Sequence, residues 1–268
     1  MDKILYEETK ANEPVQVIDF YYPLWETYKG AGGCITKLVE SMMAGDEEAL
    51  EILCENLSHQ LSFYEATYLA VPYMVKLLAK YEEEKNIPQM LYLISNLGII
   101  LGTEFENLDR ECEEQIYEVY KNSKEILREK VKCFLSENIE DLFEFDDNQG
   151  ILSMLVCGLP AIMGEEDITF LLTMACGEQC CIMCESCEYV EETDVYDEEL
   201  EIEPLEIDYE QWNGKDFNNT AMWLGYIAEK IYPELLESLP IYFGTYTCPE
   251  CGNKGKVLDL MKKYFTEE

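Results

Sequence analysis

The sequence predicts an all-α fold in which helix pairs stack, followed by a small zinc-bound, partly β segment near the C-terminus. Apolar residues recur at helical spacing between residues 35 and 176. One stretch in that range, residues 57–80, is apolar on two sides. After residue 177 the chain becomes rich in cysteine and acidic residues. We therefore expect an N-terminal cap (1–34), a helical array (35–176) and a zinc-stapled acidic segment packed on the array (177–268).

The first helices of the array follow an irregular cap. The cap has aromatic residues near position 20 and three glycines between 30 and 33, and we expect it to cover the first helix pair. A short helix is predicted over residues 35–44, ended by Gly45. Asp46 is suited to cap a second helix, whose apolar side runs from Leu50 to Leu57.

The stretch from residue 57 to 80 organises the rest of the array. Ser62 and Glu65 have the spacing of a capping box, which predicts that the helix begins there. Two sets of apolar residues follow, so both flanks should be covered by neighbouring helices. Pro72 removes one internal hydrogen bond and should kink the helix.

Four more helices complete the predicted array, over residues 88–101, 108–136, 151–162 and 168–176. Pro88 suits the first turn of the first of them. Gly98 lies inside that helix, where we expect a neighbour to approach closely. The short links between the helices favour antiparallel pairs.

The segment after residue 177 has a different character. Residues 200–203 and 205–209 alternate apolar and acidic side chains on either side of Pro204, and they are expected to form a hairpin or an edge pair of strands. A helix is predicted to begin near residue 219 and to be interrupted at Pro233. A final short helix is predicted over residues 257–265. Residues 246–252 should form a loop.

Two Cys-x-x-Cys pairs predict a structural zinc site. Cys248 and Cys251 are followed by a glycine, which lets backbone N–H groups turn toward sulfur, and Cys184 with Cys187 is their best partner pair. Four thiolates satisfy the tetrahedral preference of zinc. Cys181 with Cys184 is a competing pair and Cys180 is a spare ligand. Free, partly buried thiols are the alternative reading.

The charge predicts a basic partner. The chain has 56 acidic and 19 basic residues, a net charge of −37, which repels nucleic acid and anionic membranes. Between Lys132 and Lys215 there are 23 acidic residues and no basic one. As a block, this stretch favours a docking surface over a merely solvated one. Its candidate partner-binding residues are Glu191, Glu192, Tyr196, Glu198, Glu199 and Trp212.

No catalytic site is expected. His59 is the only histidine, which excludes clusters of several histidines, and the chain has neither a phosphate-binding glycine loop nor a nucleophile elbow. A Cys54–His59 pair is conceivable. We favour a structural role in which His59, together with Gln60, caps or braces the entrance of the central helix.

One short motif resembles a known family. His59-Gln60, Ser62, Tyr64, Ala66-Thr67 and Ala70-Val71-Pro72-Tyr73 are similar to a motif of bacterial HEAT-like α-solenoid proteins, about twenty residues in all. Leu61 stands where that family has a small residue, usually glycine. Some members lie beside toxin genes as presumed immunity proteins.

The resemblance implies a HEAT-like superhelix and a binding protein that neutralises a basic toxin. A zinc-dependent or redox-active enzyme and a structural repeat scaffold are the alternatives. No signal-peptide-like or membrane-spanning run is evident in the sequence, so a cytoplasmic protein is expected.

Overall fold

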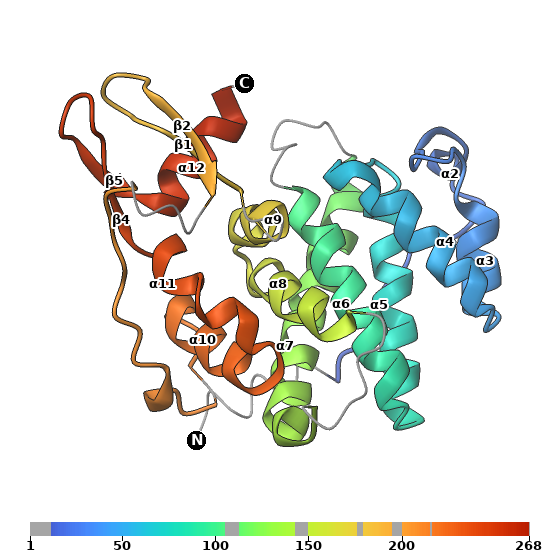
Figure 1. The fold of residues 1–268 in the computed structure, drawn as a ribbon. Helices are drawn as coiled ribbons and strands as arrows, with labels where there is room; N and C mark the ends of the chain where they lie inside the picture. Colours follow the sequence, from blue (N-terminus) through green and yellow to red (C-terminus); the bar gives the residue numbers. More distant parts are fainter. Residues whose placement is uncertain are drawn as a thin grey trace.

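The structure is a computed structural model that describes residues 12–104, 113–142, 150–175, 179–194, 200–214 and 216–267. These residues are mostly helical, with two small sheets toward the C-terminus (Figure 1). The helices are α2 Leu24–Thr27, α3 Thr36–Met43, α4 Glu47–Ser58, α5 Thr67–Glu83, α6 Ile87–Gly102, α7 Glu114–Leu142, α8 Ile151–Met163, α9 Glu166–Ala175, α10 Thr220–Ile231, α11 Leu239–Tyr242 and α12 Val257–Glu267.

Most predicted helices exist within a few residues of their expected limits. The helix α7 runs from Glu114 to Leu142, whereas it was expected over residues 108–136, of which 108–112 lie outside the described residues. Asp46 caps α4 as predicted, because its carboxylate accepts a hydrogen bond of 3.2 Å from the Ala49 N–H. Asn86 caps α6 in the same way, and Pro88 lies in the first turn.

The predicted start of the central helix is wrong. The helix α5 begins at Thr67, and Ser62 is in an extended conformation outside it. A 3-10 turn at His59–Leu61 separates α4 from this region, with Gln60 and Leu61 at φ of 55° and 54°. Such left-handed values favour glycine. The first N–H groups of α5 bond to the carbonyls of residues 64–66 instead of to a capping side chain.

The body of α5 agrees with its sequence. Both of its flanks are buried, against α6 and α7 among others, and the helix continues through the buried Pro72. Phe63, just before the helix, packs edge to face with Tyr68 in the first turn. A helix apolar on two sides therefore lies inside the protein rather than on its surface.

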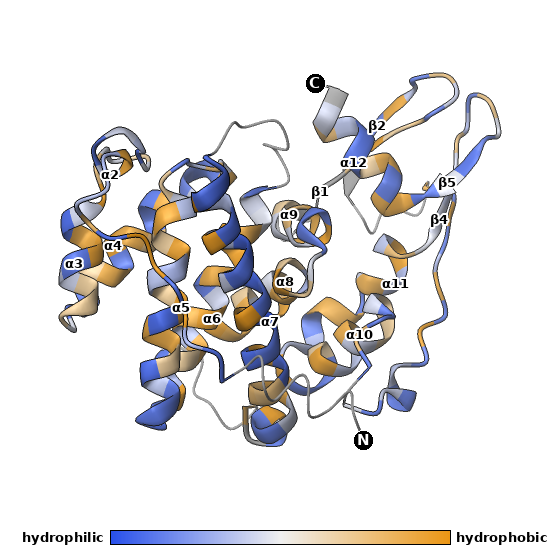
Figure 2. Cartoon of the chain, turned by 180° about the vertical axis from the view of Figure 1, so that it is seen from behind, coloured by the Kyte–Doolittle hydropathy of each residue, from blue (hydrophilic) through white to orange (hydrophobic). Residues whose placement is uncertain are grey.

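The helices α6 and α8 approach each other closely. A Cβ atom added at Gly98 would lie 2.6 Å from the backbone oxygen of Gly158, so the two backbones touch there. The Ser95 hydroxyl donates across the same contact to the Ile151 carbonyl at 3.1 Å. This confirms the close approach expected at Gly98. Apolar residues are concentrated where the helices meet in this central part of the protein (Figure 2).

The strands differ from the prediction. Ile202–Glu203 (β3) does not form a hairpin with residues 205–209, where the backbone of Leu205 instead bonds to the Pro240 carbonyl. It pairs with Thr245–Thr247 (β4), which also pairs with Lys254–Lys256 (β5). A second, unpredicted sheet is the antiparallel hairpin of Gln179–Met183 (β1) and Val190–Asp194 (β2).

Polar contacts and a shared core attach the C-terminal elements to the helices. Asp167, at the start of α9, forms a salt bridge of 3.0 Å with Lys262 of α12. The Thr220 hydroxyl of α10 donates to the carboxylate of Glu165, with its oxygen 2.6 and 2.7 Å from the two carboxylate oxygens. The buried apolar residues of α10, α12 and β1 belong to the same cluster as those of α5 to α9. The hairpins are thus carried on a packed helical support.

Candidate metal centre

The turn between β1 and β2 presents Cys184 and Cys187. The backbone N–H of Cys184 donates to the Tyr189 carbonyl at 2.9 Å, and that of Glu188 donates to the Cys184 carbonyl at 3.0 Å. Glu188 has a φ of 59°, in the left-handed region. These bonds close a tight loop in which the two thiols point to one side.

The turn between β4 and β5 repeats this arrangement. The N–H of Cys248 donates to the Asn253 carbonyl at 2.9 Å, and that of Gly252 donates to the Cys248 carbonyl at 2.9 Å. Gly252 has a φ of 71°. The residue after the second cysteine is therefore left-handed in both turns. It is a glycine in one turn and a glutamate in the other, so only the second turn carries that signal in its sequence.

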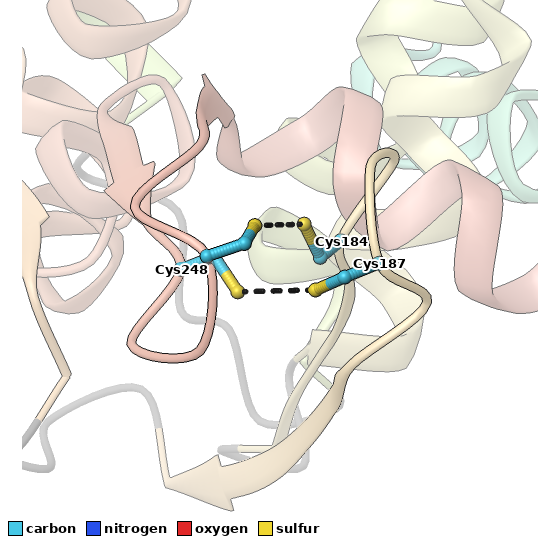
Figure 3. A group of neighbouring side chains, drawn as sticks. Cys184, Cys187 and Cys248 are labelled. Carbon is cyan, nitrogen blue, oxygen red and sulfur yellow. Dashed lines mark hydrogen bonds between the residues drawn. The ribbon is translucent and has the colours of Figure 1, made fainter.

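The two turns bring four sulfur atoms together. The ligand atoms of Cys184, Cys187, Cys248 and Cys251 all lie within 4.8 Å of one another. The Cys184–Cys251 sulfurs are 3.6 Å apart and the Cys187–Cys248 sulfurs 3.7 Å (Figure 3). In a tetrahedron with zinc–sulfur bonds of about 2.3 Å, neighbouring sulfurs are about 3.8 Å apart. The geometry thus fits a four-coordinate metal ion.

The cluster is half inside the protein. Cys184 and Cys248 are each 1% exposed, whereas Cys187 and Cys251 are exposed. Burial acts to raise the pKa of the Cys184 thiol, but the backbone N–H groups of Ser186 and Cys187 and the neighbouring thiols lower it to about 7. The same N–H groups would stabilise a metal-bound thiolate. The half-buried Lys263 of α12 donates from its ammonium group to the Cys184 carbonyl at 3.4 Å.

The competing ligand pair is not used. Cys181 lies on β1 opposite Glu192, half-buried and outside the four-sulfur cluster, and the side chain of Cys180 lies outside the described residues. Within the part of the chain that the structure describes, no other cluster of cysteine, histidine or acidic residues has metal-ligand spacing.

The predicted partner-binding residues have mixed outcomes. Trp212 was expected to be an exposed anchor, which is wrong: it is 6% exposed and packs on Phe217 and Tyr226. Its indole N–H donates to the Asp216 carbonyl at 2.7 Å. Both the ring and its N–H group therefore contact residues of this chain.

The structure describes two of the four acidic residues that were predicted to bind a partner. Glu191 accepts a hydrogen bond of 2.9 Å from the Tyr189 hydroxyl, and the exposed Glu192 accepts one of 2.8 Å from Tyr264 of α12. Both therefore help to hold the hairpin as well as contributing charge. Tyr196, Glu198 and Glu199 lie outside the described residues.

The surroundings of Cys54 disfavour a reactive Cys54–His59 pair. Burial and the nearby Glu51 and Glu55 raise the pKa of Cys54 to about 12, which keeps that thiol protonated. His59 is exposed, and its carbonyl accepts hydrogen bonds from the Ser62 N–H at 3.2 Å and the Tyr64 hydroxyl at 3.4 Å. Its backbone therefore braces the turn before α5.

The chain matches no protein-family profile, no curated protein and no solved structure. None of the described helices combines the length and the apolar character needed to cross a membrane. The four-cysteine cluster is accordingly the strongest guide to function.

Proposed function

We propose that Cys184, Cys187, Cys248 and Cys251 bind one zinc ion in a structural role. The support is the pair of matching turns, whose four sulfurs lie at the spacing of a tetrahedral site. Four protein ligands fill the coordination sphere and leave no position for a catalytic water. The ion would join two hairpins that are distant in the chain, since Cys187 and Cys248 are 61 residues apart.

Elemental analysis of protein purified without chelators tests the metal. We expect about one zinc per chain, and Cys251→Ser should lose it. Cys181→Ser is the matched control, because that cysteine lies on the same hairpin outside the cluster, and it should retain the ion. Iron in place of zinc, or no metal in the unaltered protein, would refute the assignment, since four thiolates accept either metal.

We further propose that the zinc-fastened hairpins present an acidic surface to a basic partner protein. Exposed acids lie on both hairpins and on the segment that follows β3, among them Glu185, Glu188, Glu206 and Glu250. Among the described residues from 179 to 214, only Glu203 forms a salt bridge with another described residue, Lys254. The other described acids of this stretch form no salt bridge with a described residue, and their charge would attract a cationic surface.

Within this class we propose an immunity protein that neutralises a basic toxin, built on a HEAT-like superhelix. The motif from His59 to Tyr73 supports it, and so do the consecutive helices that contact each other as α3–α4, α5–α6 and α8–α9. The left-handed Leu61 fits a position that the resembling family fills with a small residue.

Association kinetics with a partner captured from the native host test the acidic surface. Exposed charges are screened within about 8 Å at physiological salt, so association should be fast and should slow as salt rises. Neutralising four acids of this surface should lower the on-rate about tenfold and change the off-rate less. The substitutions are Glu185→Gln, Glu188→Gln, Glu206→Gln and Glu250→Gln.

A second variant controls for net charge. Four exposed acids of α4 and α5 can be neutralised in the same way, so that the total charge changes equally far from the hairpins. These are Glu48→Gln, Glu51→Gln, Glu55→Gln and Glu83→Gln. Equal slowing in both variants, or a partner that is itself acidic, would show that the hairpin surface is only solvated.

A further inference from the structure

The four thiols are paired across the two turns in a specific way. All four sulfurs lie within 4.8 Å of one another, and two close contacts join an exposed cysteine to a buried cysteine of the other turn. Cys187 faces Cys248 at 3.7 Å, and Cys251 faces Cys184 at 3.6 Å. The buried member of each pair is 1% exposed. A solute can therefore reach the exposed cysteine of each pair, whereas the protein shields the other cysteine from solvent.

We propose that this centre is also a site of thiol oxidation, in which a peroxide converts it into two crossed disulfides, Cys184–Cys251 and Cys187–Cys248. The oxidised form would have no metal ligands left, yet it would keep the two hairpins joined. The inference extends the four-cysteine site proposed above, but it does not depend on which metal fills that site.

The order of steps follows from the exposure of the sulfurs. A peroxide oxidises an exposed thiol to a sulfenic acid and is reduced to water. The buried thiol of the facing turn then attacks the sulfenic sulfur. The sulfur–oxygen bond breaks, the disulfide forms, and the leaving hydroxide takes the thiol proton to give a second water. Two peroxides thus oxidise four thiols and yield four waters. From four metal-bound thiolates the same sum takes up four protons and releases the metal ion.

Crossed pairing requires only short movements of the sulfur atoms. Each pair has to close from 3.6 or 3.7 Å to about 2.0 Å, which a small approach of one hairpin to the other achieves. The hydrogen bonds that shape each turn, such as Gly252 N–H to the Cys248 carbonyl, remain in place. A disulfide within a turn would leave the two turns without a covalent link once the metal had gone.

Peroxide titration of the metal-loaded protein tests the proposal. A Cys34→Ser background removes the exposed thiol of the N-terminal region, which could otherwise join two molecules. We expect two equivalents of hydrogen peroxide to release the bound metal, measured with a coloured chelator. Peptide mapping should then find the two crossed disulfides, and proteolysis of the hairpins should stay as slow as in the loaded protein.

Single variants distinguish the two patterns. In Cys187→Ser, crossed pairing leaves a Cys184–Cys251 disulfide, whereas pairing within turns leaves Cys248–Cys251. Mapping the oxidised unaltered chain gives the same decision if the variant folds poorly. Disulfides within turns, or stable sulfinic acids at Cys187 and Cys251, would overturn the proposal even if zinc is bound. If crossed disulfides form in a protein that contains no metal when purified, the zinc assignment is refuted and the proposal of crossed oxidation is supported.

Discussion

Removal of the metal should detach the two hairpins from each other and leave most of the helical protein folded. Structural zinc is worth about 10 kcal/mol or more in small zinc-binding domains, which far exceeds any single side-chain contact. Treatment with a chelator, or Cys248→Ser, should therefore speed proteolysis between residues 179 and 211 by at least about 100-fold. Helical circular dichroism should change little, because the core of α5 to α8 does not depend on the ion.

Two comparisons make this result specific. Adding zinc back to the chelated protein should restore resistance, while Cys248→Ser should not respond. Cys181→Ser, on the same hairpin, should behave like the unaltered chain. If chelation leaves the rate of proteolysis unchanged, packing of α12 on α9 and the Asp167–Lys262 salt bridge hold the segment, and the metal is dispensable.

Substitution of Gly98 by alanine should produce the second large effect. The new methyl group would meet the Gly158 backbone at 2.6 to 2.7 Å, and a backbone cannot turn aside as a flexible side chain can. Overpacking of this kind costs about 1–3 kcal/mol and at times more. Alanine gains about 1 kcal/mol over glycine in a helix, which offsets only part of the loss. We expect a net decrease of about 2 kcal/mol in the free energy of unfolding, measured by urea denaturation.

Gly225 of α10 provides the matched control. A methyl group there would approach side-chain atoms of Tyr209 and Ile207 at 3.2 to 3.5 Å, which can shift by a few tenths of an ångström. Gly225→Ala should therefore change stability by less than about 1 kcal/mol, with helix propensity partly balancing the contact. A stable Gly98→Ala protein would mean that α6 and α8 can separate at little cost.

The features that could be predicted from sequence are those decided by nearby residues. Helix periodicity located α3 to α9 within a few residues at most ends, and the Asp46 cap depends only on the turn that follows it. The two cysteine pairs were likewise recognisable, since each ligand pair is held by one loop. Their meeting was inferred from chemistry, because two such turns together supply the four thiolates that a tetrahedral zinc site requires.

The features that were missed depend on contacts between distant segments. Ser62 and Glu65 have the right spacing for a cap, but the left-handed Gln60 and Leu61 turn the chain so that α5 starts later. The strand β3 pairs with β4, more than 40 residues away, rather than with its neighbour. Trp212 lies in an acidic stretch that reads as surface, yet Phe217 and Tyr226 enclose its ring.

The long interval between the cysteine pairs has a consequence for biosynthesis. Cys187 leaves the ribosome 61 residues before Cys248. At about 5–20 residues per second this is a delay of about 3 to 12 seconds. During that time the β1–β2 turn exists with only half of its ligand set, and its thiols have Cys180 and Cys181 as neighbours. The order of synthesis therefore makes assembly of the four-cysteine cluster a late event. By then the helices up to α9, on which the hairpins pack, have already been synthesised.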